Sequence, residues 1–311
     1  MSVSRTIAIV GASGHLGKEV AGSLLSSTFR QSYGNVLLLT RDRGDSQVAA
    51  TPDGAETRRF SNDELADALQ GVDVLISTVG PTGHSFKDTL VDAIAQSSVK
   101  LYIPSEFGVD HTVHDFSQPE WDHKKHHDAL VRARLQKTKV CRIYDGLFLE
   151  DSLGPWFGMD VKRGIFHSVG SADSPISFAT KADVGKVVAQ LARMPYDEVP
   201  PHLRISGDAL SMRQIAKVLE DAGSSPIAVK EIELNEYKRR AIAENVPDPM
   251  KYLRFLMGEG KINHTESGLG NDNELVNPGQ SLWKWKTVSE YAKEVNGRPW
   301  ADYDWPAEGT D

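Results

Sequence analysis

The chain carries the stretch Gly11-Ala12-Ser13-Gly14-His15-Leu16-Gly17 directly after an apolar run, Ile7–Val10. Glycines at this spacing allow a tight turn, a close backbone approach to a pyrophosphate and close packing of a helix on a strand. Free amide groups at the start of that helix favour a bound anion. We interpret the stretch as a dinucleotide-binding loop rather than a glycine-rich turn without a ligand, because it joins a predicted strand to a predicted helix. The predicted cofactor contacts here are Gly11, Ser13, Gly14, His15, Leu16 and Gly17.

Short apolar runs alternate with helical patterns over the first 150 residues. Strand-like runs occur at residues 7–10, 36–39, 57–60, 72–77, 101–103 and 140–144. Helical patterns occur at residues 15–26, 62–69, 85–96 and 120–135. Strands and helices that alternate at this spacing form a parallel sheet with helices on both faces. The sequence therefore predicts an α/β fold with a doubly wound, Rossmann-type parallel sheet.

After Gly146 the alternation becomes looser. Residues 181–193 and 211–220 again have helical patterns, whereas the surrounding segments mix aromatic residues, glycines and short apolar runs. We predict a nucleotide-binding Rossmann domain over residues 1–150 that resumes at about residues 175–220. Residues 151–174 and 221–311 are predicted to form a smaller, interleaved substrate-binding lobe.

The composition is that of a globular protein, with 40% hydrophobic and 25% charged residues among 311. The net charge of −8 argues against a nucleic-acid or anionic-membrane partner, since both favour basic patches. The single cysteine, Cys141, cannot form an internal disulfide and is typical of a reducing compartment. Residues 1–10 lack the apolar core of a signal peptide, and no apolar run approaches the roughly 20 residues of a membrane span. We expect a cytoplasmic protein without a nucleic-acid or membrane partner; the oligomeric state stays open.

The end of the second predicted strand distinguishes NAD from NADP. An acidic residue about 20 residues beyond the loop would bind the ribose 2′-hydroxyl, but the residue near that position is Thr40. Arg41 follows, with Arg43 two residues later, and a guanidinium matches a 2′-phosphate in charge and in hydrogen-bonding geometry. Asp42 leaves an alternative open, since a shift of one residue would bring an acid to this position. We predict NADP(H) as the cofactor, with Arg41 at its 2′-phosphate.

The fourth predicted strand ends in small residues. In a doubly wound sheet the carboxyl ends of the strands lie beside the cofactor, and small side chains leave room for it. The predicted contacts at this strand end are Ser77, Thr78, Val79 and Gly80. The alternative is an ordinary turn after a strand.

One catalytic motif is missing, and another motif indicates a family. None of the eight tyrosines has a lysine four positions later, so the Tyr-x-x-x-Lys pattern of short-chain dehydrogenases is absent. The loop GASGHLG, the strand end ISTVG and above all Pro104-Ser105-Glu106-Phe107-Gly108 resemble the isoflavone reductase-like and NmrA-like group of atypical short-chain dehydrogenases, over about residues 5–220. The resemblance implies a Rossmann domain, a preference for NADPH and a pocket between two lobes for a small aromatic or phenolic substrate. It also implies that Phe107 lies near the nicotinamide.

The resemblance further implies that, in the reductases of this group, a lysine at the start of the helix after the PSEFG motif is catalytic. Here Lys124 is followed by His127 and Val131 on one helix face, where the family has core residues at i+3 and i+7. Lys125 would share its face with Asp128 and Arg132, a poor core face. We therefore prefer Lys124, and Lys125 stays open as the alternative.

Five histidines crowd the same region, namely His111, His114, His123, His126 and His127. Their spacing could bind a metal ion, but no cysteine or ordered ligand pattern accompanies them. We predict no metal and expect the histidines at the mouth of the pocket, where one of them could assist the lysine.

Aromatic residues after the sixth predicted strand, Phe148, Trp156, Phe157 and Phe166, could form a substrate wall, although such residues more often form core. Two functional hypotheses follow. The first is an NADPH-dependent reductase of small aromatic or phenolic metabolites, in which hydride leaves the nicotinamide and a lysine acts as general acid or base. The second, from the NmrA-like side of the resemblance, is a dinucleotide-sensing regulator without turnover.

Overall fold

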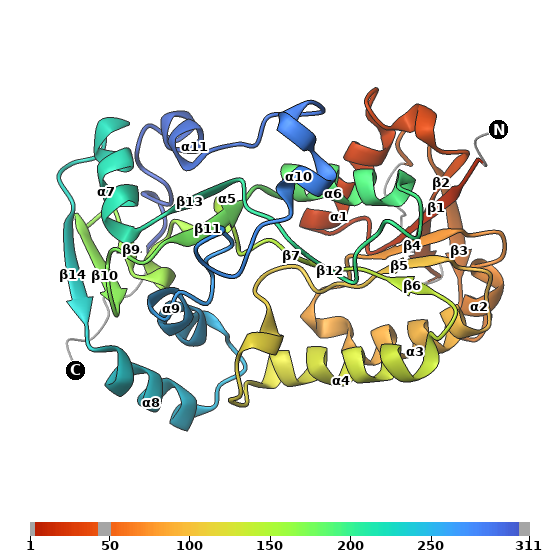
Figure 1. Ribbon diagram of the computed structural model, residues 1–311, viewed down its shortest axis with the longest axis horizontal. Coiled ribbons are helices and arrows are strands. Elements are labelled where there is room, and N and C mark those ends of the chain that lie inside the picture. Colours follow the sequence, from red (N-terminus) through yellow and green to blue (C-terminus); the bar gives the residue numbers. More distant parts are fainter. Residues whose placement is uncertain (1–3, 43–50, 305–311) are drawn as a thin grey trace.

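The computed structural model describes residues 4–42 and 51–304. Six parallel strands form its central sheet in the order β3-β2-β1-β4-β5-β6 (Figure 1). The strands are β1 (Thr6–Val10), β2 (Asn35–Arg41), β3 (Glu56–Phe60), β4 (Val74–Ser77), β5 (Leu101–Ile103) and β6 (Lys139–Val140). The chain leaves β1 first toward β2 and later crosses to β4, so the strand order reverses beside β1. The predicted Rossmann-type, doubly wound α/β fold is confirmed.

Helices cover both faces of this sheet. They are α1 (His15–Leu25) and α6 (Lys181–Arg193) on one face, and α2 (Leu65–Ala68), α3 (His84–Ala95) and α4 (Pro119–Arg134) on the other (Figure 1). Strand β1 shows why: Ile7 and Ile9 pack toward α1 and α6, whereas Ala8 and Val10 pack toward α2 and α3. Successive side chains of a strand point to opposite faces, so a strand between two helical layers is apolar throughout.

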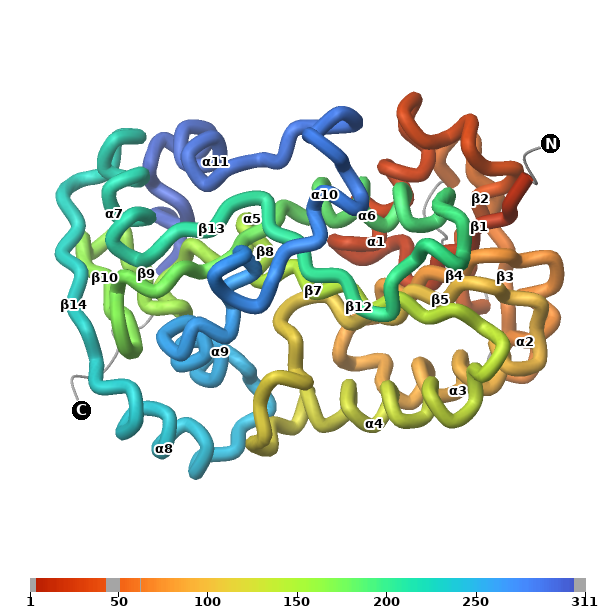
Figure 2. Tube along the Cα trace, viewed as in Figure 1, coloured from red at the N-terminus to blue at the C-terminus, as the bar shows by residue number. Residues whose placement is uncertain are grey.

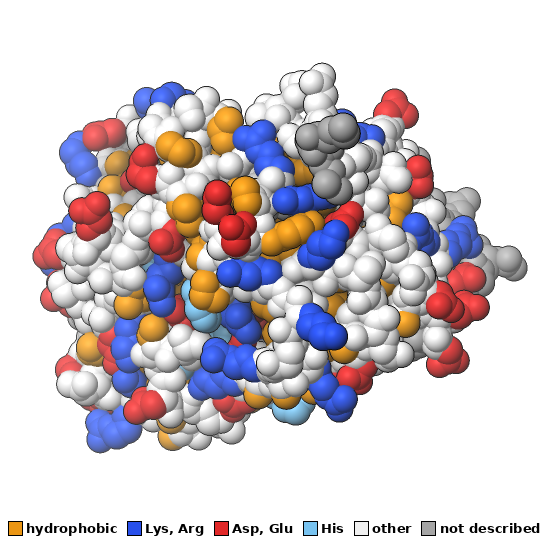
Figure 3. Space-filling view, turned by 45° about the vertical axis from the view of Figure 1, so that its right-hand side comes forward, with side chains coloured by type: hydrophobic (Ala, Val, Ile, Leu, Met, Phe, Trp, Pro, Cys, Tyr) orange, Lys and Arg blue, Asp and Glu red, His pale blue; other side chains and the backbone are white. Residues whose placement is uncertain are grey.

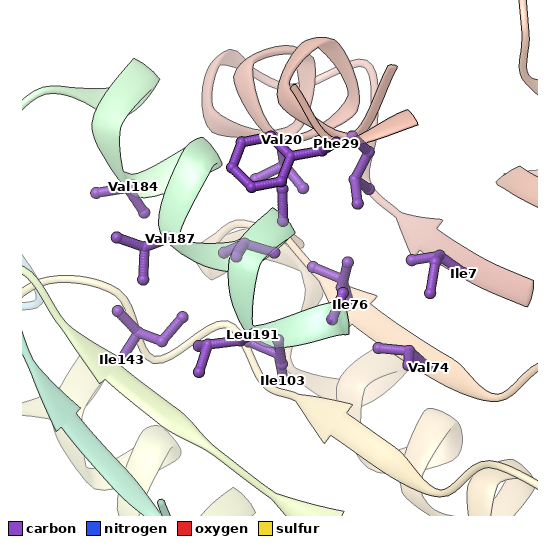
Figure 4. Close-up of a cluster of buried hydrophobic side chains, with 14 of the residues drawn as sticks. Ile7, Val20, Phe29, Val74, Ile76, Ile103, Ile143, Val184, Val187 and Leu191 are labelled. Atoms are coloured by element: carbon purple, nitrogen blue, oxygen red, sulfur yellow. The ribbon is translucent and has the colours of Figure 1, made fainter. Parts of the chain in front are cut away.

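The core between the sheet and α6 is shown in Figure 4. Val184, Val187 and Leu191 recur at helical spacing on α6 and meet side chains of the sheet such as Ile76 and Ile103. All five are fully buried. Helix α6 therefore packs on the central sheet although it follows β6 by some 40 residues, and its bounds match the helical pattern predicted over residues 181–193.

The predicted strand over residues 140–144 is divided in the structure. Its first part, β6, pairs with β5, and its second part, β7 (Arg142–Tyr144), pairs in parallel with β12 (His202–Arg204). The backbone N–H of Cys141 still donates to the Tyr102 carbonyl at 3.1 Å. One extended segment thus changes its hydrogen-bonding partner, which hydrophobic alternation alone does not reveal.

The second lobe contains two small sheets and most of the later helices. One sheet joins β9 (Met159–Asp160), β10 (Ile165–Val169) and β14 (Ala228–Ile232), and the other joins β8 (Leu147–Phe148), β11 (Ile176–Ala179) and β13 (Asp208–Leu210). The helices are α5 (Leu149–Ser152), α7 (Met212–Asp221), α8 (Leu234–Glu244), α9 (Met250–Gly258), α10 (Asn273–Val276) and α11 (Val288–Glu294). Single 3₁₀ turns lie at Arg30–Ser32, Asn62–Glu64, Pro81–Gly83, His111–Val113, Pro155–Phe157 and Pro278–Gln280.

The two lobes are interleaved along the chain. Helix α7 packs its apolar face, including Ile215 and Leu219, into the core of the second lobe. Conversely, Trp283 and Trp285 join the core of the first lobe, and the tube in Figure 2 shows the chain near α10 returning to α6. The division into residues 1–150 with 175–220 against the remainder stays a prediction. Within it, α7 packs with the second-lobe cluster, and Trp283 and Trp285 pack with the central sheet.

The surface in Figure 3 carries Lys and Arg side chains interspersed with Asp and Glu, and hydrophobic side chains gather with basic ones near its middle. Among residues 4–42 and 51–304, no helix is long and apolar enough to cross a bilayer.

Candidate functional site

The glycine loop joins β1 to α1 at the carboxyl edge of the sheet. Gly11 has a φ of +87°, and a Cβ atom there would lie 2.9 Å from the Thr78 carbonyl carbon. A Cβ on Gly17 would lie 2.2 Å from the Gly11 carbonyl oxygen. Neither position accommodates a side chain, because backbone atoms fill the space. The geometry is therefore the tight turn with close helix packing that the motif predicts.

Helix α1 begins without a side-chain cap. Its N-cap is Gly14, no cap hydrogen bond is made by a side chain, and its first turn contains no acidic residue. Ser13 lies in the turn before the helix, and His15 and Leu16 are its first two residues. Uncapped amides at a helix N-terminus are suited to bind an anion such as a phosphate.

The end of β4 lies directly beside this loop. The Thr78 amide donates to the Val10 carbonyl at 2.9 Å, and its hydroxyl donates to the same oxygen at 3.1 Å. Ser77 is fully buried, and Val79 and Gly80 continue along the edge toward α3. The structure thus brings together the two predicted groups of cofactor residues; their contact with a cofactor stays a prediction.

Arg41 is the last residue of β2, on the other side of β1 from β4. Its guanidinium carbon lies 4.7 Å from the centre of the Phe86 ring, which in turn stacks on Phe60 with ring centres 5.8 Å apart. A guanidinium over an aromatic face is held by cation–π attraction while its N–H groups stay available at the edge. The carboxylate of the neighbouring Asp42, the acid that left NAD open as the alternative cofactor, lies 3.8 Å from the Arg59 guanidinium. Arg43 lies outside the described residues.

The two candidate lysines of α4 point to different places. Lys124 Nζ donates to the Phe107 carbonyl at 3.1 Å, whereas Lys125 Nζ donates to the Phe116 carbonyl at 3.4 Å. His127 and Val131 are buried on the face that Lys124 begins, as the predicted helix register requires. Only Lys124 therefore faces the PSEFG segment, although its chemical role stays a prediction.

Hydrogen bonds to Asp145 and Gly146 hold the loop that carries Phe107. The Gly108 amide donates to Asp145 Oδ1 at 2.5 Å, and Gly108 accepts in return from the amides of Asp145 and Gly146. Gly108 has a φ of +113°, a conformation that favours glycine. Burial raises the pKa of Asp145 to about 7. These bonds orient the Phe107 carbonyl that holds Lys124.

Sequence reasoning missed a group of buried ionisable residues beneath the site. Glu106, within the PSEFG motif, is 3% exposed, and its Oε2 lies 3.4 Å from Nδ1 of the buried His111. Burial raises the pKa of Glu106 to about 7 and lowers that of His111 to about 3. Lys87 of α3 is only 5% exposed. The signal for Lys87 was present, because it precedes Leu90 and Val91 by three and four positions on the apolar face of its helix.

The histidines mostly join α3 to α4. His84 Nε2 lies 2.8 Å from Glu120 Oε2, and its ring stacks on that of His123 with centres 4.3 Å apart. His127 Nδ1 lies 3.3 Å from Asp88 Oδ1. Contrary to the expectation of a histidine-lined pocket mouth, His111 and His114 are buried, and only His123 and His126 are exposed. In the part of the chain that the structure describes, no group of three or more His, Cys, Asp or Glu could hold a metal ion.

We therefore expect chelation to change little. After treatment with EDTA and removal of the chelator, the melting temperature and the affinity for a dinucleotide should equal those of untreated protein. A structural metal would contribute folding free energy directly. A large fall in melting temperature that added zinc reverses would contradict the prediction.

Aromatic residues of α4, the segment before it and α9 form a cluster that does not include those that follow the sixth predicted strand. Trp121 lies one helical turn before Lys124. The ring centres of Trp121 and of Tyr252 from α9 lie 5.9 Å apart. Phe116 stacks on Tyr252 with ring centres 5.7 Å apart. Phe157 and Phe166 instead lie buried in the core of the second lobe. The second lobe therefore reaches the site through α9.

Three features are those of Rossmann-type proteins: the glycine loop, the reversal of strand order beside β1 and the helices on both faces of the sheet. The family model described as "NmrA-like family" matches residues 3–292, and the chain belongs to this family. The resemblance predicted from the PSEFG segment is thereby confirmed.

The individual relatives have low sequence identity to this chain but align with most of its length. An NmrA-like family domain-containing oxidoreductase of Gibberella moniliformis is 26% identical over 242 residues, 76% of each chain. An isoflavone reductase of Cicer arietinum is 23% identical over 248 residues, 71% of this chain and 76% of the relative. The solved structure of AtPrR2 with NADP+ and (+)-pinoresinol has a TM-score of 0.72 at 17% identity. The alignment covers 94% of this chain and 99% of the AtPrR2 chain. These curated relatives are oxidoreductases, and the structural likeness concerns the fold.

Proposed function

We propose that the protein is an NADPH-dependent reductase of small aromatic or phenolic metabolites, with Lys124 as its general acid or base. One observation carries the proposal: the Lys124 ammonium is hydrogen-bonded to the carbonyl of Phe107, which follows β5, the strand that neighbours β4. The names of two relatives support it, since one is an isoflavone reductase and another was solved with NADP+ and a phenolic compound.

The residues at the sheet edge fit a dinucleotide. Gly11 and Gly17 leave a cradle that a Cβ atom would fill, and the uncapped start of α1 would bind the pyrophosphate. Arg41 would bind the 2′-phosphate of the adenosine half. Since β4 and β5 lie on the side of β1 opposite Arg41, the nicotinamide half would extend toward Ser77–Gly80 and Phe107. When bound, NADPH supplies a hydride.

Lys124 would move the proton that accompanies this hydride. Its Nζ carries three N–H groups as an ammonium, and only one bond, to the Phe107 carbonyl, is made within the described chain. A second N–H is thus available to a substrate oxygen, which it would protonate as the neighbouring carbon is reduced. The rings of Trp121, Phe116 and Tyr252 would form the apolar wall beside it.

The proposal is tested by NADPH consumption against a panel of phenolic ketones, isoflavone-like enones and benzylic ethers. Loss of NADPH absorbance with formation of a reduced product in at least one class is the expected result. NADPH binding without turnover of any panel member would contradict the reductase and favour a dinucleotide-sensing regulator.

A further inference from the structure

Gln118 has a buried side chain that the proposed reductase mechanism does not use. It immediately precedes α4, the helix that carries Lys124, and is fully buried. Its Oε1 accepts a hydrogen bond from the Trp121 amide at 2.9 Å, which caps the N-terminus of α4. Its Nε2 donates to the carbonyls of Pro247 at 2.7 Å and Val246 at 3.3 Å. One side chain thus joins α4 to the loop between α8 and α9.

A helix cap alone does not require glutamine at this position. Serine, threonine, aspartate and asparagine are the preferred N-cap residues, because their short side chains reach the free amides of the first turn. The amide of a glutamine is longer and carries two N–H donors besides the oxygen that caps the helix. At Gln118 these donors bond carbonyls that lie 128 and 129 positions later in the chain. Gln118 therefore serves a contact between distant segments as well as the cap.

The loop between α8 and α9 depends on this contact. Two of its residues, Pro247 and Pro249, have no N–H group and cannot donate backbone hydrogen bonds. Within the described part of the chain, Gln118 makes the only hydrogen bonds between residues 104–134 and residues 234–258. Figure 2 shows the loop at the N-terminal end of α4. Without these bonds the attachment of the loop to α4 would rest on side-chain packing alone.

The same contact sets the position of the aromatic cluster. Trp121, whose amide donates to Gln118, packs its ring against Tyr252 of α9, and Phe116 stacks on the same tyrosine. Helix α9 begins three residues after Pro247. A loop that is fixed at Pro247 therefore fixes the start of α9, and with it Tyr252, relative to α4.

We propose that Gln118 is a positioning residue, which holds the aromatic rings of α9 against α4 and thereby determines how tightly the protein binds its substrate. The inference rests on the proposed function, in which Trp121, Phe116 and Tyr252 form the apolar wall of the substrate site. If the loop detaches, α9 carries Tyr252 away from this wall, whereas Lys124 stays on α4. Loss of the contact should therefore weaken substrate binding more than it slows the chemical step.

The size of the effect follows from the two hydrogen bonds to the loop. One net hydrogen bond changes an equilibrium constant by roughly fivefold, so loss of both should shift the loop toward its detached state by more than tenfold. The apparent affinity for a ligand falls with the fraction of protein in the state that binds it. We expect an increase of roughly tenfold in KM for the substrate when both bonds are removed.

Three variants separate the loop contact from the helix cap. Gln118→Ser keeps a preferred cap oxygen for the Trp121 amide but is too short to reach the loop, whereas Gln118→Ala removes both. Asn277→Ser is the matched control, because Asn277 is also a fully buried amide that bonds two partners, the Trp283 carbonyl and the Leu282 amide. It ends α10, on the far side of the molecule from α4 and α8 in Figure 1.

The first measurement is amide hydrogen exchange, which needs no substrate. Gln118→Ser should speed exchange over residues 245–257 by roughly tenfold and leave residues 119–134 unchanged. Gln118→Ala should speed exchange in both segments, and Asn277→Ser in neither. If Gln118→Ser does not fold, Gln118→Asn replaces it, since asparagine is also a preferred cap and is one methylene shorter than glutamine.

The second measurement is steady-state kinetics with a substrate found in the phenolic panel, together with titration of NADPH. In Gln118→Ser the KM for the substrate should rise roughly tenfold while kcat stays within about threefold, the pattern of lost binding rather than lost chemistry. The Kd for NADPH should not change. Asn277→Ser should alter neither KM nor kcat, although its melting temperature may fall as far as that of Gln118→Ser.

Two outcomes overturn the inference while leaving the reductase proposal intact. One is unchanged exchange over residues 245–257 in Gln118→Ser, which would show that packing alone holds the loop. The other is faster exchange with an unchanged KM, which would make the contact purely structural. Absence of turnover by the wild type would instead overturn the proposed function, and the role of Gln118 in substrate binding with it.

Discussion

Replacement of Lys124 by Ala is expected to lower kcat by roughly 10²- to 10⁴-fold, the usual contribution of one proton-transfer group. The variant loses the only side chain of α4 that donates to the Phe107 carbonyl, so the proton of the reaction would have to come from water. The Kd for NADPH should change little, because the reduced ring is uncharged. The measurement is steady-state kinetics with a substrate found in the panel, together with direct titration of NADPH.

The matched control is Lys125→Ala. Lys125 has the same chemistry and is the next residue of the helix, but it donates to the Phe116 carbonyl and lies 3.9 Å from Asp122. We expect an effect of less than tenfold. If the two effects are reversed, the helix register of the catalytic lysine is wrong by one residue. If neither variant loses activity, the lysine mechanism is wrong.

The contrast between these two lysines shows what periodicity can predict. The face shared by Lys124, His127 and Val131 follows from the 3.6-residue repeat, and the structure buries the latter two residues. The same reasoning located α6 at its observed bounds and the glycine loop between β1 and α1. These features depend on local sequence, which a single chain displays directly.

Other features depend on contacts between distant segments. Nothing local distinguishes Arg142–Tyr144, which pairs with β12, from Lys139–Val140, which pairs with β5. The aromatic cluster at α4 combines Phe116 and Trp121 with Tyr252, which lies more than 130 positions later. Sequence reasoning selected the aromatics after the sixth strand because it could not know which of them the second lobe buries.

Sequence reasoning did not single out Lys87, which the structure buries. Its position among Phe86, Leu90 and Val91 indicates the apolar face of α3, yet a lysine there is easily assigned to solvent, since its stem can reach the surface. Its burial depends on neighbours distant in sequence, since Lys124 and Glu120 of α4 and Glu106 of the PSEFG segment act on its charge. A charged residue in the apolar register of a helix is therefore a signal that merits a functional hypothesis even without a structure.

Arg41→Ala should reduce the preference for NADPH over NADH by about one to two orders of magnitude, the contribution expected of charge-assisted hydrogen bonds to a phosphate. The guanidinium ends β2 and rests on the Phe86 ring, so its orientation is set before the cofactor binds and little side-chain entropy is lost. The affinity for NADH, which lacks the 2′-phosphate, should stay nearly constant, and the whole effect should appear in the Kd for NADPH. Fluorescence titration of both dinucleotides measures it.

Arg41→Lys separates charge from geometry in the same assay. A lysine keeps the positive charge but loses the planar fork and the stacking on Phe86, so we expect an intermediate preference. Arg134→Ala is the matched control, because Arg134 is an exposed arginine at the far end of α4, 3.9 Å from Asp92. Equal affinities of the wild type for NADPH and NADH would contradict the assignment of Arg41. A preference that survives in Arg41→Ala would instead assign the 2′-phosphate to another basic residue near the end of β2.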